Sequence, residues 1–278
     1  MLNNPMENMK KMSKKIRIEQ DAIGKKKIPS DAYTGIFHAR AKENFSLSAR
    51  KFPMLFYHQL ALLKRVAAQE HVHAGRIEAK QGNAIIRAAR EIEKGKFDVL
   101  FDVDVFEAGA GTPLNMTMNE IIANRALELL GERKGKYSII HPNNHVNMMQ
   151  STNDVIPTVL RLTAIHLSQN IEKELIQTIH VAEELSQKYR SAIKMGRTHV
   201  QTAVPVTFGQ ELYVYAQSLR DNLQKIRVAR EGLNELSIGG TAVGTGITPE
   251  PLYDVNIVKR LRKETGLPLF PSHRKMLH

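Results

Sequence analysis

The chain has 278 residues, of which 42% are hydrophobic and 24% charged, and its formal net charge is +12. This composition is ordinary for a globular protein and excludes a disordered chain, and the absence of cysteine excludes disulfides, thiolate catalysis and cysteine-based zinc sites. The positive charge lies at the ends: residues 1–28 and 259–278 each carry +5, and the other 230 carry only +2. Since nucleic-acid-binding domains gather basic residues on one folded face, we expect no nucleic-acid partner.

The N-terminal segment is basic and polar. The first twenty residues hold no apolar core of a secretory signal, and no uninterrupted apolar run approaches the ~20 residues that span a bilayer. We therefore expect a cytoplasmic protein with no membrane contact. Residues 1–16 are expected to form a basic, disordered tail.

Helical patterns dominate the first half of the chain. Apolar residues at helical spacing predict helices at about 55–70, 78–94 and 114–131. Short apolar runs predict strands near 99–106 and 138–141. This part is therefore expected to be mainly helical, with few strands.

Two longer helices are predicted over 158–195 and 210–231, which contain neither proline nor glycine. Their apolar stripes, with members three or four residues apart, consist of Ile171, Leu175, Ile179, Ala182 and Leu185, and of Leu212, Tyr215, Leu219, Leu223 and Ile226. Stripes of this length need partner helices, and other subunits are one source of them. The pattern predicts a mainly α fold built as a long-helix bundle.

Polar segments lie between these helices. They read G-A-G-T-P-L-N-M-T-M-N-E (109–120), H-V-N-M-M-Q-S-T-N-D (145–154) and K-M-G-R-T-H-V-Q-T-A-V-P (194–205), with G-G-T-A-V-G-T-G (239–246) after the second long helix. Each one alone can be explained by helix caps and turns. Several such segments beside long helices favour a shared binding site.

The chemistry of these segments suits a small carboxylate. Hydroxyls, amides and helix N-termini are donors to anions. They offer no carboxylate pair for glycoside hydrolysis and no G-x-x-x-x-G-K-[ST] phosphate loop. His71 and His73 would point to different faces of a helix, so we expect no metal site. The residues alone allow a cofactor-free enzyme acting on a small carboxylic acid.

The order and spacing of these segments resemble the fumarase/aspartase superfamily. The resemblance begins near R-I-E-Q-D-A-I-G (17–24), includes S-D-A-Y-T-G (30–35), and covers roughly nine-tenths of the chain. It implies a long-helix bundle of the fumarase/aspartase type with a smaller N-terminal helical domain. The implied parts are an N-terminal domain at 17–150, an incomplete central helical-bundle domain at 151–268 and a divergent tail at 269–278.

Within the superfamily, A-G-A-G-T, K-G-K-Y (134–137), M-Q-S-T-N-D and K-M-G-R-T-H are similar to the aspartate ammonia-lyases, whereas His141-Pro142 and Gly239-Gly240 look more like fumarases. The resemblance implies reversible elimination of ammonia from L-aspartate to give fumarate, without a cofactor. A class II fumarase that hydrates fumarate to malate is the alternative. A second alternative is a non-catalytic truncated remnant.

The resemblance also implies the substrate-binding residues, which are Thr112, Ser151, Thr152, Asn153, Thr198 and His199. Thr112 and Ser151 are expected to bind carboxylate oxygens, and the others to hold the second carboxylate and the amino group. Taken alone, His199 also fits a structural histidine in a turn. Pro113 and Thr202 depart from the family pattern beside these positions.

The family's serine base and a carboxylate-binding lysine belong to a segment of the type G-S-S-x-M-P-x-K-x-N-P, which has no match here. Catalytic residues are therefore unknown, and the chain alone is expected to be inactive. In the family each site collects residues from three subunits of a homotetramer. The implied partners are a small dicarboxylate or amino-acid substrate and other copies of the chain.

Overall fold

The computed structural model describes residues 15–109, 111–247 and 251–277. The chain forms two compact units, one made of residues up to Leu160 with those from Leu236 onward, and the other of Arg161–Glu235. The expected disordered tail at 1–16 lies outside the described residues except at its end, where Ile16 already belongs to a strand. The expected domain boundary at residue 150 stays a prediction.

The first unit begins with an antiparallel hairpin of β1 (Ile16–Asp21) and β2 (Gly24–Pro29), which the sequence patterns did not predict. Asp21 closes its turn, because one carboxylate oxygen accepts the amides of Ile23 and Gly24 at 2.9 and 3.0 Å. Gly24 has φ = +140°, a conformation that side chains disfavour. Turn chemistry therefore fixes this hairpin although its strands are rich in charge.

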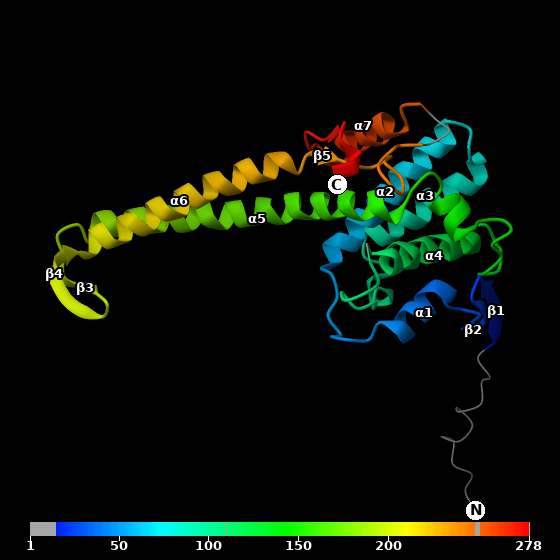
Figure 1. The fold of residues 1–278 in the computed structure, drawn as a ribbon, viewed down its shortest axis with the longest axis horizontal. Coiled ribbons are helices and arrows are strands. Elements are labelled where there is room, and N and C mark those ends of the chain that lie inside the picture. Colours follow the sequence, from blue (N-terminus) through cyan, green and yellow to red (C-terminus); the bar gives the residue numbers. More distant parts are fainter. Residues whose placement is uncertain (1–14, 110, 248–250, 278) are drawn as a thin grey trace, which may run out of the picture. The chain divides into compact units, whose positions relative to one another are not determined.

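Helices make up the rest of this unit (Figure 1). Their bounds are α1 (Ile36–Asn44), α2 (Met54–His73), α3 (Ala79–Glu93), η2 (Asp98–Leu100), α4 (Thr112–Leu129), the π-helical turn η3 (Pro142–Val146), the start of α5 (Thr152–Lys188), α7 (Tyr253–Thr265) and η4 (Lys275–Leu277). The helices predicted near 55–70, 78–94 and 114–131 are confirmed as α2, α3 and α4. Because α3, α4 and α7 pack on α2, α2 is buried on most sides and lies at the centre of the core.

The strand predictions for two segments of this region are wrong. Residues 99–106 form a 3₁₀ turn and an irregular segment, in which Asp104 accepts the amides of Ser48, Ala49 and Phe106. Residues 138–141 form a turn that leads into η3. Side-chain-to-backbone hydrogen bonds hold both segments in place of a strand partner.

The end of the first unit packs against its glycine-rich loop. Ser272 donates its amide to the Leu236 carbonyl at 2.8 Å, next to the pairing of β5 (Glu235–Leu236) with β6 (Phe270–Pro271). A side chain at Gly244 would lie 2.6 Å from the backbone of Met276. The segment expected to be a divergent tail is therefore part of the packed structure.

The second unit is an antiparallel helix pair, formed by the rest of α5 and by α6 (Phe208–Gly232), with the hairpin of β3 (Ile193–Thr198) and β4 (Gln201–Thr207) at one end (Figure 1). The first long helix was predicted over 158–195, but it begins at Thr152 and ends at Lys188. It ends there because the chain must turn back: a Cβ at Gly209 would lie 2.5 Å from Arg190 Cα, so the two helices meet closely at this point. Thr207 and Gln210 form a reciprocal capping box at the start of α6.

Ion pairs and apolar contacts connect α5 and α6. Glu172 binds Arg227 and Arg230 at 2.7 and 2.6 Å, and Glu183 binds Arg220. Ile179 and Leu223 are buried, whereas Ile171 and Tyr215 from the same predicted stripes stay exposed.

In the described part of the chain no helix is both long and apolar enough to cross a bilayer. The mainly helical, long-helix architecture predicted from the sequence is confirmed.

Candidate functional site

Ser151 and Asp154 build the start of α5. The Ser151 hydroxyl accepts the Asn153 amide at 3.2 Å, and the Asp154 carboxylate accepts the Ser151 amide at 3.0 Å. This S-x-x-D arrangement is a reciprocal helix cap. Because this hydroxyl donates to no group of the described residues, its proton stays available for an outside anion. Ser151 is half-exposed and Asn153 is exposed, so both reach solvent.

The start of α4 lies against the start of α5. Gly111 has φ = +87°, and a Cβ there would lie 3.0 Å from Ile156. Thr112 follows as the first, exposed residue of α4. One turn on, Asn115 donates its side-chain amide to Thr152 Oγ1 at 3.2 Å. Four of the six predicted site residues, those from 112 and 151–153, therefore belong to one region of the first unit.

Asp154 ties this region to the glycine-rich loop. Its buried carboxylate accepts the amides of Gly239 and Thr241 at 3.1 and 2.8 Å, in addition to that of Ser151. Burial raises the pKa of Asp154 to about 6, against the lowering effect of these amides and of Lys64. The aspartate is thus a structural acceptor with all its hydrogen bonds directed at the backbone.

A cavity of about 370 Å³ opens beside Asn153. Its lining comes from the start of α5, the loop after Ser237 and the C-terminal turn that carries Lys275. In the loop, Thr241 has φ = +60°, an uncommon value for a β-branched residue. Backbone strain of this kind is often retained at ligand sites. Here the hydrogen bond from the Thr241 amide to Asp154 stabilises the strained conformation.

Thr198 and His199 lie in the second unit. Thr198 ends β3 and pairs with Gln201, so His199 and Val200 form a two-residue hairpin turn. Both turn residues have positive φ, 45° and 65°, as such turns require. The segment 194–205, interpreted from sequence as a polar loop, is a hairpin whose exposed tip carries the two predicted residues.

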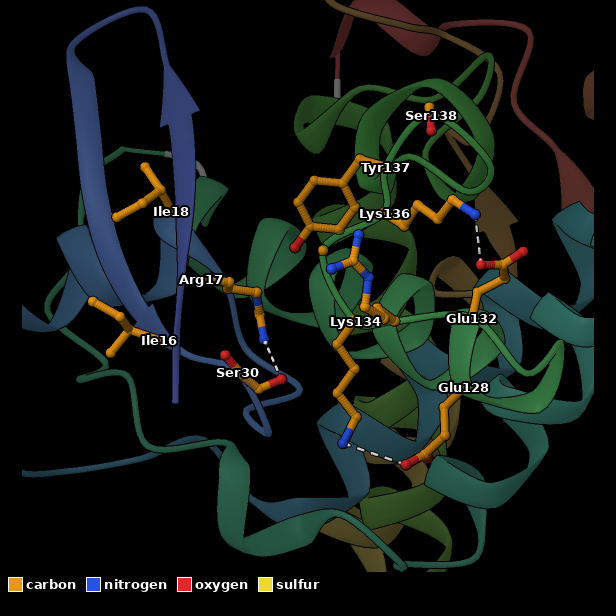
Figure 2. A pocket seen from close by; sticks show the side chains of 12 residues that line it. Ile16, Arg17, Ile18, Ser30, Glu128, Glu132, Lys134, Lys136, Tyr137 and Ser138 are labelled. Atoms are coloured by element: carbon orange, nitrogen blue, oxygen red, sulfur yellow. Dashed lines mark hydrogen bonds and ion pairs between the residues drawn. The ribbon is translucent and has the colours of Figure 1, made fainter. Parts of the chain in front are cut away.

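A second, larger cavity, of about 770 Å³, contains none of the predicted residues (Figure 2). It lies between the β1–β2 hairpin and the segment that follows α4. Three of the four cations that line it have partners: Lys134 binds Glu128 at 3.3 Å, Lys136 binds Glu132 at 2.7 Å, and the Arg17 guanidinium donates to backbone carbonyls. The fourth, Arg133, is exposed to solvent. With most of its charges paired inside the molecule, this cavity is a weaker candidate for an anionic substrate than the helix starts.

Three buried polar residues at the site were missed by the sequence interpretation. They are Lys64, Asn115 and Asn147. Asn115 carried a usable signal, because it stands three residues after Thr112, on the same face of the helix and within the same polar segment. Lys64 and Asn147 carried none, since they meet across 83 positions of sequence. His71, which the sequence indicated only as an unsuitable metal ligand, contacts the Met148 carbonyl at 3.0 Å through its ring Nε2.

Glu107, in the segment that leads to α4, provides a test of the local electrostatics. Both of its carboxylate oxygens are buried, and neither has a hydrogen-bond partner of good geometry among the described residues, the Leu114 amide being a weak one. Burial raises its pKa from 4.5 to about 7, against a smaller lowering effect of the Leu114 amide. The folded state therefore prefers the protonated acid, and ionisation at higher pH lowers stability.

Replacing Glu107 by glutamine is therefore expected to stabilise the protein by about 1–2 kcal/mol at pH 8, after discounting for partial exposure, and to have no effect near pH 4. The gain should appear between the unfolded pKa of 4.5 and the folded value of about 7. Urea unfolding at several pH values measures it, with the exposed Glu174→Gln as control. An equal effect at pH 4 and pH 8 would contradict this assignment.

Comparison with known proteins places the chain among lyases. A family model described as lyase matches residues 24–277. An aspartate ammonia-lyase from Bacillus subtilis (strain 168) is 42% identical over 92% of this chain and 54% of that protein. A class II fumarate hydratase from Halobacterium salinarum is 41% identical over 92% of this chain and 54% of that protein. The chain therefore spans about half the length of the curated relatives it matches.

Solved structures agree with this placement. A fumarate lyase:delta crystallin from Brucella melitensis superposes with a TM-score of 0.88 at 40% identity, covering 94% of this chain and 57% of the other. A class II fumarase from Schistosoma mansoni gives a TM-score of 0.84 at 32% identity, covering 94% of this chain and 58% of the other. Both similarities extend over nearly the whole of the chain described here.

Proposed function

The chain belongs to the lyase family that contains the aspartate ammonia-lyases and the class II fumarases, and on that premise we propose that it supplies part of the substrate-binding site of an aspartate ammonia-lyase. The reaction is the reversible elimination of ammonia from L-aspartate to give fumarate. The proposal includes a cytoplasmic location and a substrate that is a small dicarboxylate or amino acid.

The observation that carries this proposal is the meeting of two helix starts that present hydroxyl donors. Thr112 begins α4 and Ser151 caps α5, and the Asn115 bridge to Thr152 holds these starts together. Helix N-termini carry positive potential, and hydroxyl protons add directed hydrogen bonds to a carboxylate. Removal of a proton beside the β-carboxylate builds negative charge on that group, and fixed donors stabilise it.

Thr198 and His199 are proposed to complete this arrangement in the assembled enzyme. The strained two-residue turn exposes both side chains. In the family, sites are shared among subunits, so these residues would serve a site with the first unit of another copy. The proposal does not require them to meet the residues of the first unit within one chain.

Class II fumarase remains the second candidate. The relatives of the two activities are nearly equally similar, at 42% and 41% identity. The fumarase-like features also have structural roles: His141 accepts the amides of Asn143 and Asn144 to cap η3, and Gly239 has φ = +85° beside Asp254. Residues that fix local backbone are weak guides to substrate, so we favour the ammonia-lyase motifs.

Calorimetric titration of the chain with fumarate tests the proposed binding role. We expect saturable binding that Thr112→Val weakens by about 10-fold, since this nearly isosteric change removes one hydroxyl donor from a charged ligand. Thr178→Val is the matched control, because Thr178 lies on α5 and donates only to the Glu174 carbonyl. Equal affinity of the wild type and Thr112→Val would exclude Thr112 as a ligand.

The second unit is expected to associate with further copies of the chain. Many of its large apolar side chains are exposed, namely Leu167, Ile171, Val181, Leu185, Tyr189, Ile193, Met195, Val200, Val204, Phe208, Tyr213, Val214, Tyr215 and Val228. Exposed apolar surface beyond a few hundred Å² marks an interface or a site of aggregation. Light scattering after size-exclusion chromatography should show oligomers. A monodisperse species with the mass of one chain, unchanged on concentration, would contradict this.

A further inference from the structure

A fully buried lysine lies beneath the loop that precedes α5. Lys64, in the middle of α2, donates from Nζ to Asn147 Oδ1 at 2.8 Å and to Gln150 Oε1 at 2.9 Å. Both acceptors belong to the segment that runs directly into Ser151. The lysine thus connects α2, at the centre of the core of the first unit, to the candidate site.

An ammonium group at this depth is costly to keep. Removing a charge from water costs several kcal/mol even after the surroundings relax. The burial lowers the pKa of Lys64 to about 7, against a raising effect of the Asp154 carboxylate. An apolar side chain of similar length would fill the same space in α2 without this cost, so packing alone does not explain the lysine.

A second side chain of α2 reaches the same loop. His71 stands seven residues after Lys64, on the same face of the helix, and its Nε2 lies 3.0 Å from the Met148 carbonyl. Because a carbonyl only accepts, this ring nitrogen carries the hydrogen. Helix α2 therefore holds the loop at residues 147, 148 and 150.

The lysine also connects to the helix starts through one asparagine. Asn147 Oδ1, the acceptor of Lys64, also accepts from the Asn115 side chain at 3.2 Å. The Asn147 amide group donates in turn to the Gln150 carbonyl at 3.1 Å. Asn115 donates to Thr152 as well, so a continuous set of hydrogen bonds runs from Lys64 to the first residue of α5.

We propose that Lys64 is a positioning residue of the candidate site, whose buried amino group holds residues 147–150 so that Ser151, Thr152 and Asn153 are presented in a single arrangement. The part of this inference that concerns substrate rests on the proposed function. The part that concerns loop order stands on the hydrogen bonds alone. Lys64 is expected to contact no substrate atom.

Hydrogen–deuterium exchange of the full chain, read by mass spectrometry, tests loop order directly. In Lys64→Met we expect the backbone amides of residues 147–153 to exchange at least ~10-fold faster, because opening of the loop no longer breaks the hydrogen bonds to Lys64. The amides of α3 and α4 should exchange within about 2-fold of the wild-type rate. Leu63→Ala is the matched control, since it creates a cavity in the same helix and removes no hydrogen bond to the loop. Exchange that rises evenly over the unit in Lys64→Met, as in this control, would overturn the proposal.

The double variant Lys64→Met/Asn147→Leu distinguishes a positioning role of Lys64 from a role in packing alone. It also provides a test if the single variant does not fold. Replacing Lys64 and one of its two acceptors by apolar groups should restore part of the stability, while Gln150 Oε1 and the Asn115 amide each lose a partner. A positioning role predicts that loop exchange stays fast and fumarate affinity stays low despite that recovery. If both return to wild-type values together with stability, Lys64 only fills space. If the wild type binds no fumarate, the proposed function fails, and loop exchange alone decides the role of Lys64.

Discussion

Residues 1–278 prepared alone are expected to convert L-aspartate to fumarate at no detectable rate. The part of the candidate site in the first unit offers hydroxyl and amide donors for carboxylates, but its buried acidic and basic groups are engaged elsewhere. Asp154 accepts three backbone amides, and Lys64 is enclosed beneath the loop. The family serine that acts as base has no match in this sequence. Binding groups without a proton acceptor should hold a substrate and leave it unchanged.

Fumarate absorbance measures this expectation, with the Bacillus subtilis relative assayed in parallel as the active control. Turnover by the chain that Thr112→Val reduces would contradict it, because that turnover would depend on the site described here. It would also show that a base is present among these residues. Turnover insensitive to Thr112→Val would indicate a contaminating enzyme and leave the expectation in place.

The largest expected effect on stability comes from Asp154→Ala. The buried carboxylate accepts the amides of Ser151, Gly239 and Thr241, and alanine would leave all three donors without a partner. Each buried donor without a partner costs about 1–3 kcal/mol, so we expect a loss of about 3–5 kcal/mol after some relaxation. Thr241 would also lose the contact that holds its left-handed backbone.

Urea unfolding measures this loss, and Asp254→Ala is the matched control. Asp254 is partly exposed and pairs with Lys275 at 2.5 Å, so its removal should cost less than about 1 kcal/mol. A loss of similar size in both variants would show that the three backbone hydrogen bonds of Asp154 add little to stability. The link between α5 and the glycine-rich loop would then need another cause.

Helices were predictable from this sequence and the hairpins were not, for a physical reason. Long stretches without proline and glycine, with apolar residues three or four apart, leave few alternatives to a helix. The β1–β2 hairpin depends instead on Asp21 closing its turn, and β2 reads G-K-K-K-I-P, which has three consecutive lysines and no alternating apolar pattern. The β3–β4 hairpin contains glycine and proline, which suggested a loop.

The residues of the candidate site likewise fall into some that could be predicted from the sequence and some that could not. Ser151 and Thr112 could be found from motifs beside helix starts, because helix caps are local in sequence. Lys64 and Asn147 could not, since their role arises only when segments 83 positions apart meet. Periodicity placed Lys64 on a helix without revealing that this helix is buried almost all round. Long-range burial decided which polar residues matter here.

The most direct test of the account joins residues 1–268 to the C-terminal part of a relative and measures both reactions on the same preparation. One chimera takes that part from the Bacillus subtilis aspartate ammonia-lyase, and another takes it from the Halobacterium salinarum fumarate hydratase. We predict that the first releases ammonia from L-aspartate, that Thr112→Val slows this release, and that it exceeds hydration of fumarate by either chimera. Malate formation by the second chimera at an equal or higher rate would contradict the assignment and identify the chain as fumarase-like.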